Sequence, residues 1–380
     1  DDDGGPSGPN PTGNTKTYTL GEKAVPGISG TAKFIENDDG STTIELDLQN
    51  TPAGGEHPAH IHLNTAVESG NIALTLAPVD GDTGESSITI SALDNGTAVT
   101  YFDLLDFDGY INVHLSSSDL ATIVAQGDIG QNELTGESTV YPLNALAVED
   151  ISGTVTFDER VNGEALATIQ LANTPAGGEH PAHIHENTAV EGGGILFSFN
   201  PVDGDTGIGQ TNISEFDDGS DATYGDMLSI NGYINVHLSA NDLATIVAQG
   251  DIGQNAFTGE SITYPLNTKD VQGISGEAVF EERENGNTLV TLRLEGTPEG
   301  GTHPAHIHEN SAEEGGGIAI SLNPVDGTTG ISKTQVAADD NLMQLMYSDL
   351  LTYDGYINVH LSAEDLATIV AQGNIGANAN

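Results

Sequence analysis

An internal repeat of 123 residues constrains the fold of this chain more than any other feature. The segment HPAHIH begins at His57, His180 and His303, and GYINVHLS and DLATIVAQG recur with the same period. A unit of this length buries roughly two-thirds of its unfolded surface, so it can hold a core of its own. The repeat therefore predicts three tandem domains, because the stacked units of a solenoid are much shorter.

The repeat phase sets the predicted boundaries. Residues 1–11 form an acidic, Gly/Pro-rich tether, and the modules are residues 12–134, 135–257 and 258–380. This composition is typical of a flexible linker. The chain begins with Asp1 and not with Met, so we expect a processed form in which a signal peptide, and any lipid or surface anchor with it, has been lost with the N-terminus.

Within a module, apolar residues alternate with polar ones as they do in half-buried strands. The strands predicted for the first module are a segment near Tyr18 and residues 28–35, 42–48, 59–63, 71–76, 87–90 and 110–115. Asp39-Gly40 favours a tight hairpin turn, because Gly accepts a positive φ. Short strands with Gly-rich turns predict an all-β fold of three tandem antiparallel domains, Greek-key-like β-sandwiches or barrels.

One short helix is also predicted for each module. In the first module it covers Ser117–Gln126, with Ser116 as the N-cap, Asp119 in the first turn and Gly127 at its end.

Charge and composition exclude several classes of function. The chain has 57 Asp+Glu against 8 Lys+Arg, a net charge of -49, and no Cys. Nucleic acid is a poor partner, because phosphate binding needs clustered Lys and Arg. No apolar run is long enough to predict a membrane span. Without Cys there is no disulfide, thiolate metal site or cysteine nucleophile.

The same composition bears on location. An acidic, Cys-free, Lys-poor chain predicts an extracellular or cell-surface protein in calcium or high salt, where salt screens the self-repulsion. A cytosolic protein of a halophile is the alternative.

All 12 His residues fall on the repeat, four in each module. His60 and His62 are two residues apart on a predicted strand, so their rings point to one face. His114 lies in a second predicted strand, and Pro58 biases His57 to an extended conformation. The predicted metal ligands are His57, His60, His62, His114, His180, His183, His185, His237, His303, His306, His308 and His360.

Four imidazoles per module suit about one copper ion, because Cu(II) accepts a tetragonal nitrogen set and copper leads the usual affinity order. Zinc, bound tetrahedrally as a structural staple, is the alternative. Duplication of ordinary histidines is the simpler explanation. However, residues 85–100 have diverged from residues 208–223 and 331–346, while every His is kept.

HPAHIH, the Gly-rich stretch after it, GYINVHLS and IVAQGDI together resemble the chordin-type (CHRD) domain over all three modules. That resemblance implies an extracellular protein. AHIHENTAVEGGG at residues 182–194 is also similar to the copper-binding stretch of Cu/Zn superoxide dismutases. Those enzymes are Greek-key barrels with four His on copper and a further zinc site. This chain has no additional His to bridge two metals, no disulfide and no evident Arg beside the cluster.

Weaker motifs accompany the histidines. PVDGDTG at residues 78–84 is similar to a small calcium loop with Asp80 and Asp82, but the third copy has Thr328 at the second carboxylate. A tight turn is therefore the favoured interpretation, and calcium the alternative.

Two further sets of residues are candidates for supporting a metal. Glu186 and Glu309 are candidates for orienting a histidine, although the first copy has Leu63 at that position. Tyr110, Tyr233 and Tyr356 are candidates for lying near the metal, or for core positions.

The ends of the chain leave two alternatives for the segment PTGNTKTYTL. It either opens its own module, or pairs with a preceding one. In the second case residues 12–20 of one chain would close the last module of another by strand addition, which gives a head-to-tail homopolymer.

The functional prediction is a secreted or cell-surface repeat protein with a structural copper-type ion in each module. A dismutase-like copper enzyme is the first alternative and a metal-independent adhesion or matrix module is the second.

Overall fold

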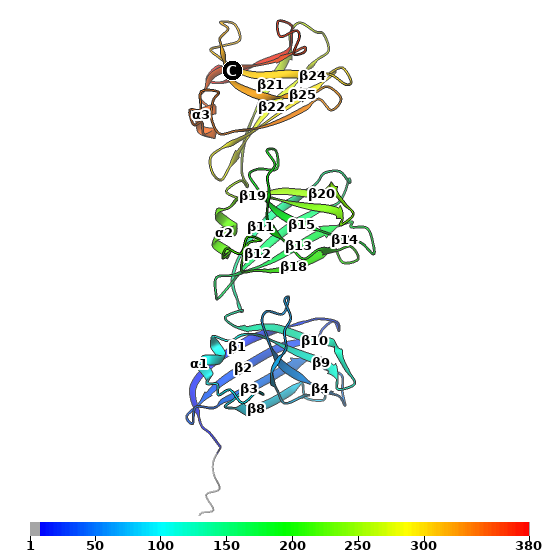
Figure 1. Cartoon of the computed structure of the whole chain (residues 1–380), viewed down its shortest axis with the longest axis vertical. Coiled ribbons are helices and arrows are strands. Elements are labelled where there is room, and N and C mark those ends of the chain that lie inside the picture. Colours follow the sequence, from blue (N-terminus) through cyan, green and yellow to red (C-terminus); the bar gives the residue numbers. More distant parts are fainter. Residues whose placement is uncertain (1–7, 380) are drawn as a thin grey trace, which may run out of the picture. The chain divides into compact units, whose positions relative to one another are not determined.

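A computed structural model describes residues 8–379 as three all-β repeats, each built on an eight-stranded antiparallel sheet (Figure 1). The predicted all-β class with three tandem antiparallel domains is thus confirmed. Close contacts divide the chain into two compact units, and the boundary between the units passes through the middle repeat. Residues 1–7 of the predicted tether lie outside the described residues, and Pro11 already belongs to a strand.

The elements of the first repeat are β1 (Pro11–Glu22), β2 (Ser29–Asn37), β3 (Thr42–Gln49), β4 (Glu56–His57), β5 (Ala59–Leu63), β6 (Ile72–Thr75), β7 (Val79–Asp80), β8 (Glu85–Ile90), α1 (Tyr101–Leu105), β9 (Asp108–Ser116) and β10 (Asp119–Gly130). Those of the second are β11 (Leu134–Ala145), β12 (Ser152–Arg160), β13 (Ala165–Ala172), β14 (Glu179–His180), β15 (Ala182–Glu186), β16 (Ile195–Ser198), β17 (Val202–Asp203), β18 (Ile208–Ile213), α2 (Tyr224–Ser229), β19 (Asn231–Ser239) and β20 (Asp242–Gly253). Those of the third are β21 (Phe257–Thr268), β22 (Ser275–Arg283), β23 (Thr288–Glu295), β24 (Thr302–Glu309), β25 (Ile318–Asp326), β26 (Ile331–Val336), α3 (Tyr347–Leu350), β27 (Asp354–His360) and β28 (Ile369–Gly376).

The sheet of the first repeat has the strand order β6-β5-β9-β10-β1-β2-β3-β8. β1 changes partner along its length: Thr15–Leu20 pair with β2, whereas Gly21 and Glu22 pair with β10. A strand that passes from one partner to another in this way turns a corner and lets the sheet curl around its own core.

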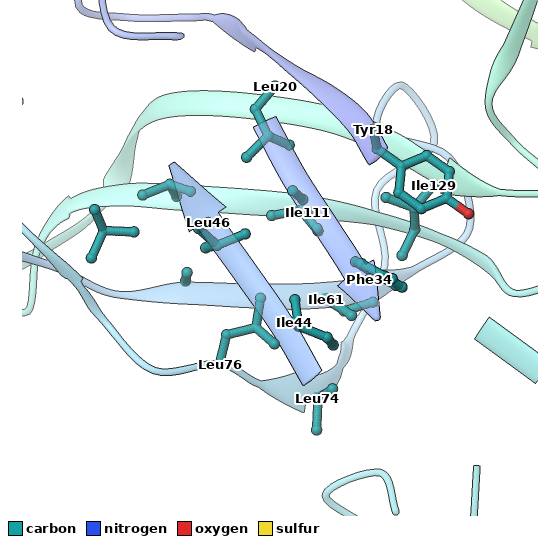
Figure 2. Packing of buried hydrophobic residues seen from close by; sticks show 14 of the residues in the cluster. Tyr18, Leu20, Phe34, Ile44, Leu46, Ile61, Leu74, Leu76, Ile111 and Ile129 are labelled. Atoms are coloured by element: carbon teal, nitrogen blue, oxygen red, sulfur yellow. The ribbon is translucent and has the colours of Figure 1, made fainter. Parts of the chain in front are cut away.

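The core of the first repeat lies inside that curl. β3 alternates buried and outward-facing residues, so Ile44 and Leu46 are fully buried. Figure 2 shows side chains of β2 and β3 meeting Ile61 and Ile111 from the strands behind them. Tyr18 packs edge-on against Phe34, with ring centroids 5.2 Å apart. The alternation seen in the sequence is therefore the alternation between core and outer face.

The predicted helix position is wrong. Residues 119–130 form strand β10, which pairs with β9, and the short helix of the first repeat is α1 at Tyr101–Leu105. The Ser116 hydroxyl does accept a bond from the Asp119 amide, but it closes the turn between two strands. The run Ala-Thr-Ile-Val-Ala that follows is rich in β-branched residues, and its place between β9 and β1 decides for a strand.

The predicted hairpin turns are present. Gly40, Gly163 and Gly286 have φ angles of 82°, 85° and 78°, in the left-handed region that glycine reaches without strain. In the first repeat this turn joins β2 to β3, which pair antiparallel over their whole length.

The segment PTGNTKTYTL belongs to its own repeat, as β1 between β2 and β10. In the third repeat β28 is likewise paired, with β21 on one side and β27 on the other. Residues 12–20 are therefore engaged within their own repeat, and self-association stays a prediction. In the part of the chain that the structure describes, no helix has the length and apolar character that crossing a bilayer needs.

Candidate metal centre

The candidate centre of the first repeat lies on the outer face of two neighbouring strands. On β5, Ala59 and Ile61 point into the core, and His60 and His62 share the opposite face; that they lie on one face is as predicted. β9 runs antiparallel beside β5, with His62 opposite Tyr110 and His60 opposite Asn112. Two residues beyond Asn112, on the same face, His114 reaches the pair.

The three rings converge. One ligand nitrogen from each of His60, His62 and His114 lies within 4.8 Å of the other two. His60 Nδ1 is 3.0 Å from His114 Nε2. Two nitrogens on one ion with bonds of about 2.1 Å are at most about 4.2 Å apart, so a small contraction brings this group onto a single metal ion.

Backbone carbonyls fix which nitrogen each ring presents. His62 Nδ1 is 2.9 Å from the Gly70 carbonyl oxygen, and His114 Nδ1 is 2.7 Å from that of Leu120. A carbonyl oxygen only accepts, so both Nδ1 atoms carry the proton and both Nε2 atoms are unprotonated. His114 Nε2 then accepts a hydrogen bond from His60 Nδ1, and a metal ion between the two rings would displace that proton. Such carbonyl partners are what orients metal-binding histidines.

The buried nitrogen of His62 is the observation that tests whether a metal fits. His62 Nε2 is shielded from solvent and has no hydrogen-bond partner among the described residues. A buried nitrogen of this kind costs free energy unless something binds it. A cation held by His62 Nε2, His114 Nε2 and His60 Nδ1 would satisfy it, so the residues present fit a metal ion.

The same centre recurs in the other repeats, as His183, His185 and His237, and as His306, His308 and His360. The short contact between rings is again 3.0 Å in both. His185 donates to Gly193 and His308 to Gly316, each at 3.1 Å, and the buried Nε2 atoms of both rings lack a partner among the described residues.

A tyrosine supports each centre from one side. The ring of Tyr110 stacks on His62 with centroids 5.0 Å apart and an angle of 17° between planes. Its hydroxyl oxygen accepts a bond of 3.3 Å from the amide of Gly70, the residue whose carbonyl holds His62. Gly70 must be glycine, because a Cβ there would lie 2.1 Å from the Leu63 carbonyl oxygen. Tyr233 and Tyr356 stack on His185 and His308 in the same way.

The fourth histidine of each module lies outside the group. His57 is buried on β4, and its Nδ1 is 3.2 Å from the backbone carbonyl oxygen of His114. His180 and His303 make the same contact with His237 and His360. The structure thus brings together three of the four histidines predicted for each module, and the fourth contacts the backbone of one of them.

The rings are electrostatically suited to be neutral ligands. Burial lowers the pKa of His60 below its ordinary 6.5, and the neighbouring His114 and His62 lower it further against the opposing effect of Asp94. Burial also lowers the pKa of His114. The neutral form, which is the one that binds a cation, is therefore favoured for these two rings at neutral pH.

Two groups that orient the rings carry no signal of their own in the sequence. The carbonyls of Gly70 and Leu120 belong to backbone, so only the fold places them beside His62 and His114. The orienting role predicted for Glu186 and Glu309 falls instead to the carbonyls of Gly193 and Gly316.

The loop similar to a calcium site is explained by hydrogen bonds. Asp80 Oδ1 accepts from the amides of Asp82 and Thr83, and Asp82 Oδ1 accepts from the amide of Gly54 at 2.7 Å. In the third copy the Thr328 hydroxyl accepts from Gly300 at 3.0 Å in the same manner. These carboxylates close a turn, which is the favoured interpretation of the motif.

Comparisons of the chain with family models, with curated proteins and with solved structures find no match. The functional argument therefore rests on the centres themselves.

Proposed function

We propose that this chain is a copper-binding repeat protein that holds one copper ion on three histidines in each repeat. The observation that carries the proposal is the convergence of one ligand nitrogen from each of three rings, with the tautomers of two rings fixed by carbonyl oxygens. Imidazole ligands suit copper and zinc, and copper binds such a set more tightly in the usual order of affinities. The absence of Cys excludes a blue-copper electron-transfer site.

A structural role is the first part of this proposal. An ion on His60, His62 and His114 would join β5 to β9 and, through the rings, tie down the segments around Gly70 and Leu120. A ligand that binds only the folded state stabilises it by about 2.7 kcal/mol when its free concentration is 100 times the Kd. Three such centres would raise the free energy of unfolding of the protein outside the cell.

The proposed location is extracellular or on the cell surface. The net charge of -49 with only 8 Lys+Arg supports it, because such a chain stays soluble in salt-rich surroundings that screen its self-repulsion. The resemblance to the chordin-type domain supports it as well.

A redox role is the second candidate, and one observation favours it. Three protein ligands leave a coordination position open, and the partly exposed His60 would place the ion near the surface. The charge of the chain disfavours an anionic substrate such as superoxide, because steering it needs positive charge near the site.

Elemental analysis of protein purified without added metal or chelator tests the proposal. We expect about three copper ions per chain, with an electron paramagnetic resonance spectrum that shows nitrogen ligands. About three zinc ions, bound in preference to copper in a competition titration, would overturn the copper assignment and the redox role together. No metal, and none taken up on titration, would leave a metal-independent adhesion or matrix protein.

A dismutase assay on the copper-loaded protein separates the two roles. Activity well above that of free copper would favour the redox role. An inactive protein whose melting temperature rises with copper would favour the structural one.

A further inference from the structure

Arg160 is a fully buried arginine that reaches from the second repeat into the first. Its side chain has no exposed surface, and its Nη1 donates to Asp128 Oδ2 at 2.8 Å and to the Asn132 carbonyl oxygen at 2.5 Å. Its Nε donates to Asn212 Oδ1 at 2.7 Å. All four residues belong to one compact unit of the chain. A guanidinium this deeply buried is stable only when its partners are well placed.

Both partners of Arg160 in the first repeat hold the loop of residues 64–71. Asp128 Oδ1 accepts a bond of 2.8 Å from the Ala66 amide, and Asn132 Nδ2 donates to the Asn64 carbonyl oxygen at 3.1 Å. This loop contains Gly70, whose carbonyl orients His62. A continuous set of contacts therefore leads from Arg160 through Asp128 and the loop to a ligand of the first centre.

The next repeat copies this arrangement. Arg283 is fully buried, and it donates to Asp251 Oδ2 at 2.8 Å and to the carbonyl oxygen of Asn255. Asp251 Oδ1 accepts a bond of 2.8 Å from the Ala189 amide, and Asn255 Nδ2 donates a bond of 2.6 Å to the Asn187 carbonyl oxygen. The loop of residues 187–194 contains Gly193, the partner of His185.

The third repeat differs at one decisive position. Asn374 occupies the place of Asp128 and Asp251, and its Oδ1 still accepts from the Ala312 amide at 2.8 Å. An amide has no charge to pair with a guanidinium, and the ion pairs among the described residues include no equivalent at Asn374. The Asn378 amide, in the place of Asn132, keeps the bonds that Asn132 makes to Asp108 Oδ1 and the Gly109 carbonyl oxygen, here to Asp354 Oδ1 and the Gly355 carbonyl oxygen. Among the described residues, the bond of Asn132 to the loop at Asn64 has no counterpart from Asn378 to Asn310.

We propose that Arg160 and Arg283 are positioning residues for the metal centres of the repeats that precede them, so that the first two centres are braced and the third is not. The effect on copper rests on the proposed function. The brace, by which we mean the contacts from Arg160 or Arg283 through Asp128 or Asp251 to the preceding loop, is present in the metal-free chain. Groups hydrogen-bonded directly to a metal ligand contribute about 10- to 100-fold in metal affinity. Arg160 acts on His62 only through Asp128 and the loop, so the lower end of that range applies. We therefore expect the first two centres to release copper about tenfold more slowly than the third.

Hydrogen exchange of the metal-free protein, read by mass spectrometry, tests the brace without any metal. The loops differ in sequence (NTAVESGN, NTAVEGGG and NSAEEGGG), so their peptides are distinguishable. We expect residues 310–317 to exchange faster than 187–194, two loops that are both Gly-rich. Arg160→Met should raise the exchange of residues 64–71 and leave 187–194 unchanged, which is the internal control. Equal rates in the two wild-type loops, or no effect of R160M on 64–71, would overturn the proposal.

A second variant covers the case in which R160M unfolds the repeat, which faster exchange throughout β5 and β9 would reveal. Asp128→Asn reproduces the residue that the third repeat already has, and it keeps the acceptor for Ala66. We expect D128N to bring the exchange of residues 64–71 to the level of 310–317, with β5 and β9 still protected. No change in the loop would contradict the brace.

The rate of copper release into excess EDTA tests whether the brace acts on the metal centres. If Arg160 and Arg283 only stabilised the fold, this rate would not differ between the centres. The wild type should release two ions slowly and one about tenfold faster, and D128N should release one slowly and two fast. A single rate for all three ions would overturn the coupling to the metal. A chain that takes up no metal would refute the proposed function, while the exchange experiment would still decide on the brace.

Discussion

His60 Nδ1 lies 3.0 Å from His114 Nε2, although 54 residues separate them in the chain. The two rings meet because β5 and β9 are neighbours in the sheet and present the same outer face. One nitrogen from each of these rings and one from His62 lie within 4.8 Å of one another, so the three rings together could hold a metal ion.

The position of His57 predicts that it does not bind the metal. Because its Nδ1 faces the backbone of His114, we expect His57→Asn, whose amide nitrogen stands near that position, to keep three copper ions per chain. His62→Ala removes a ligand, so it should lower the count to two. Elemental analysis after dialysis measures both variants. A loss of one ion from H57N, with the first repeat still folded, would restore a four-histidine centre.

The hydroxyl of Tyr110 should contribute to the copper affinity of the first centre. Tyr110→Phe keeps the ring on His62 but removes the acceptor for the Gly70 amide, so Gly70 holds His62 less firmly. We expect the copper affinity of the first centre to fall about tenfold, the lower end of what such supporting partners contribute. Competition with a chelator measures it, in a chain whose other two centres are removed by His185→Ala and His308→Ala. An affinity equal to that of the same chain with Tyr110 intact would contradict this role.

The metal-free protein should lose stability as the pH falls below about 6.5. Burial lowers the pKa of His60, His114, His237, His306 and His360, so the unfolded chain takes up protons before the folded one does. The free energy of unfolding is then fully present above the ordinary pKa of 6.5 and declines toward the lowered values. Urea unfolding between pH 7.5 and 5 measures the slope. Replacing His60 and His114 by Gln should reduce this slope, and an unchanged slope would show that other groups cause it.

The PVDGDTG loop should tolerate loss of its second carboxylate. Asp82→Thr copies the third repeat, where Thr328 accepts the equivalent backbone bond, so we expect the free energy of unfolding to change by less than about 0.5 kcal/mol. Asp80→Ala leaves two backbone amides without their acceptor and should cost about 1 kcal/mol or more. Urea unfolding distinguishes the two. Calcium that stabilises the wild type but not D82T would restore the calcium site.

Much of the architecture follows from local patterns in the sequence. Alternating apolar residues in segments such as Thr42–Gln49 require one buried and one outward face, and glycines such as Gly40 permit the turn between strands. The same period of two places His60 and His62 on one face. These features depend on residues that are close together in the chain, so they can be predicted from the sequence.

The failures have the opposite cause. Residues 119–126 carry a helix-like cap, yet they form a strand because β9 and β1 offer backbone partners on both sides. The place of His57 also could not be read from the sequence: the path of β4 turns it toward the backbone of His114, while the other three histidines of its module converge, and whether it binds a metal stays a prediction. The sequence by itself determined the repeat, the strands and the histidines. The tertiary structure alone decided which rings converge and which carbonyls orient them, because those contacts join segments whose distance depends on how the sheet curls.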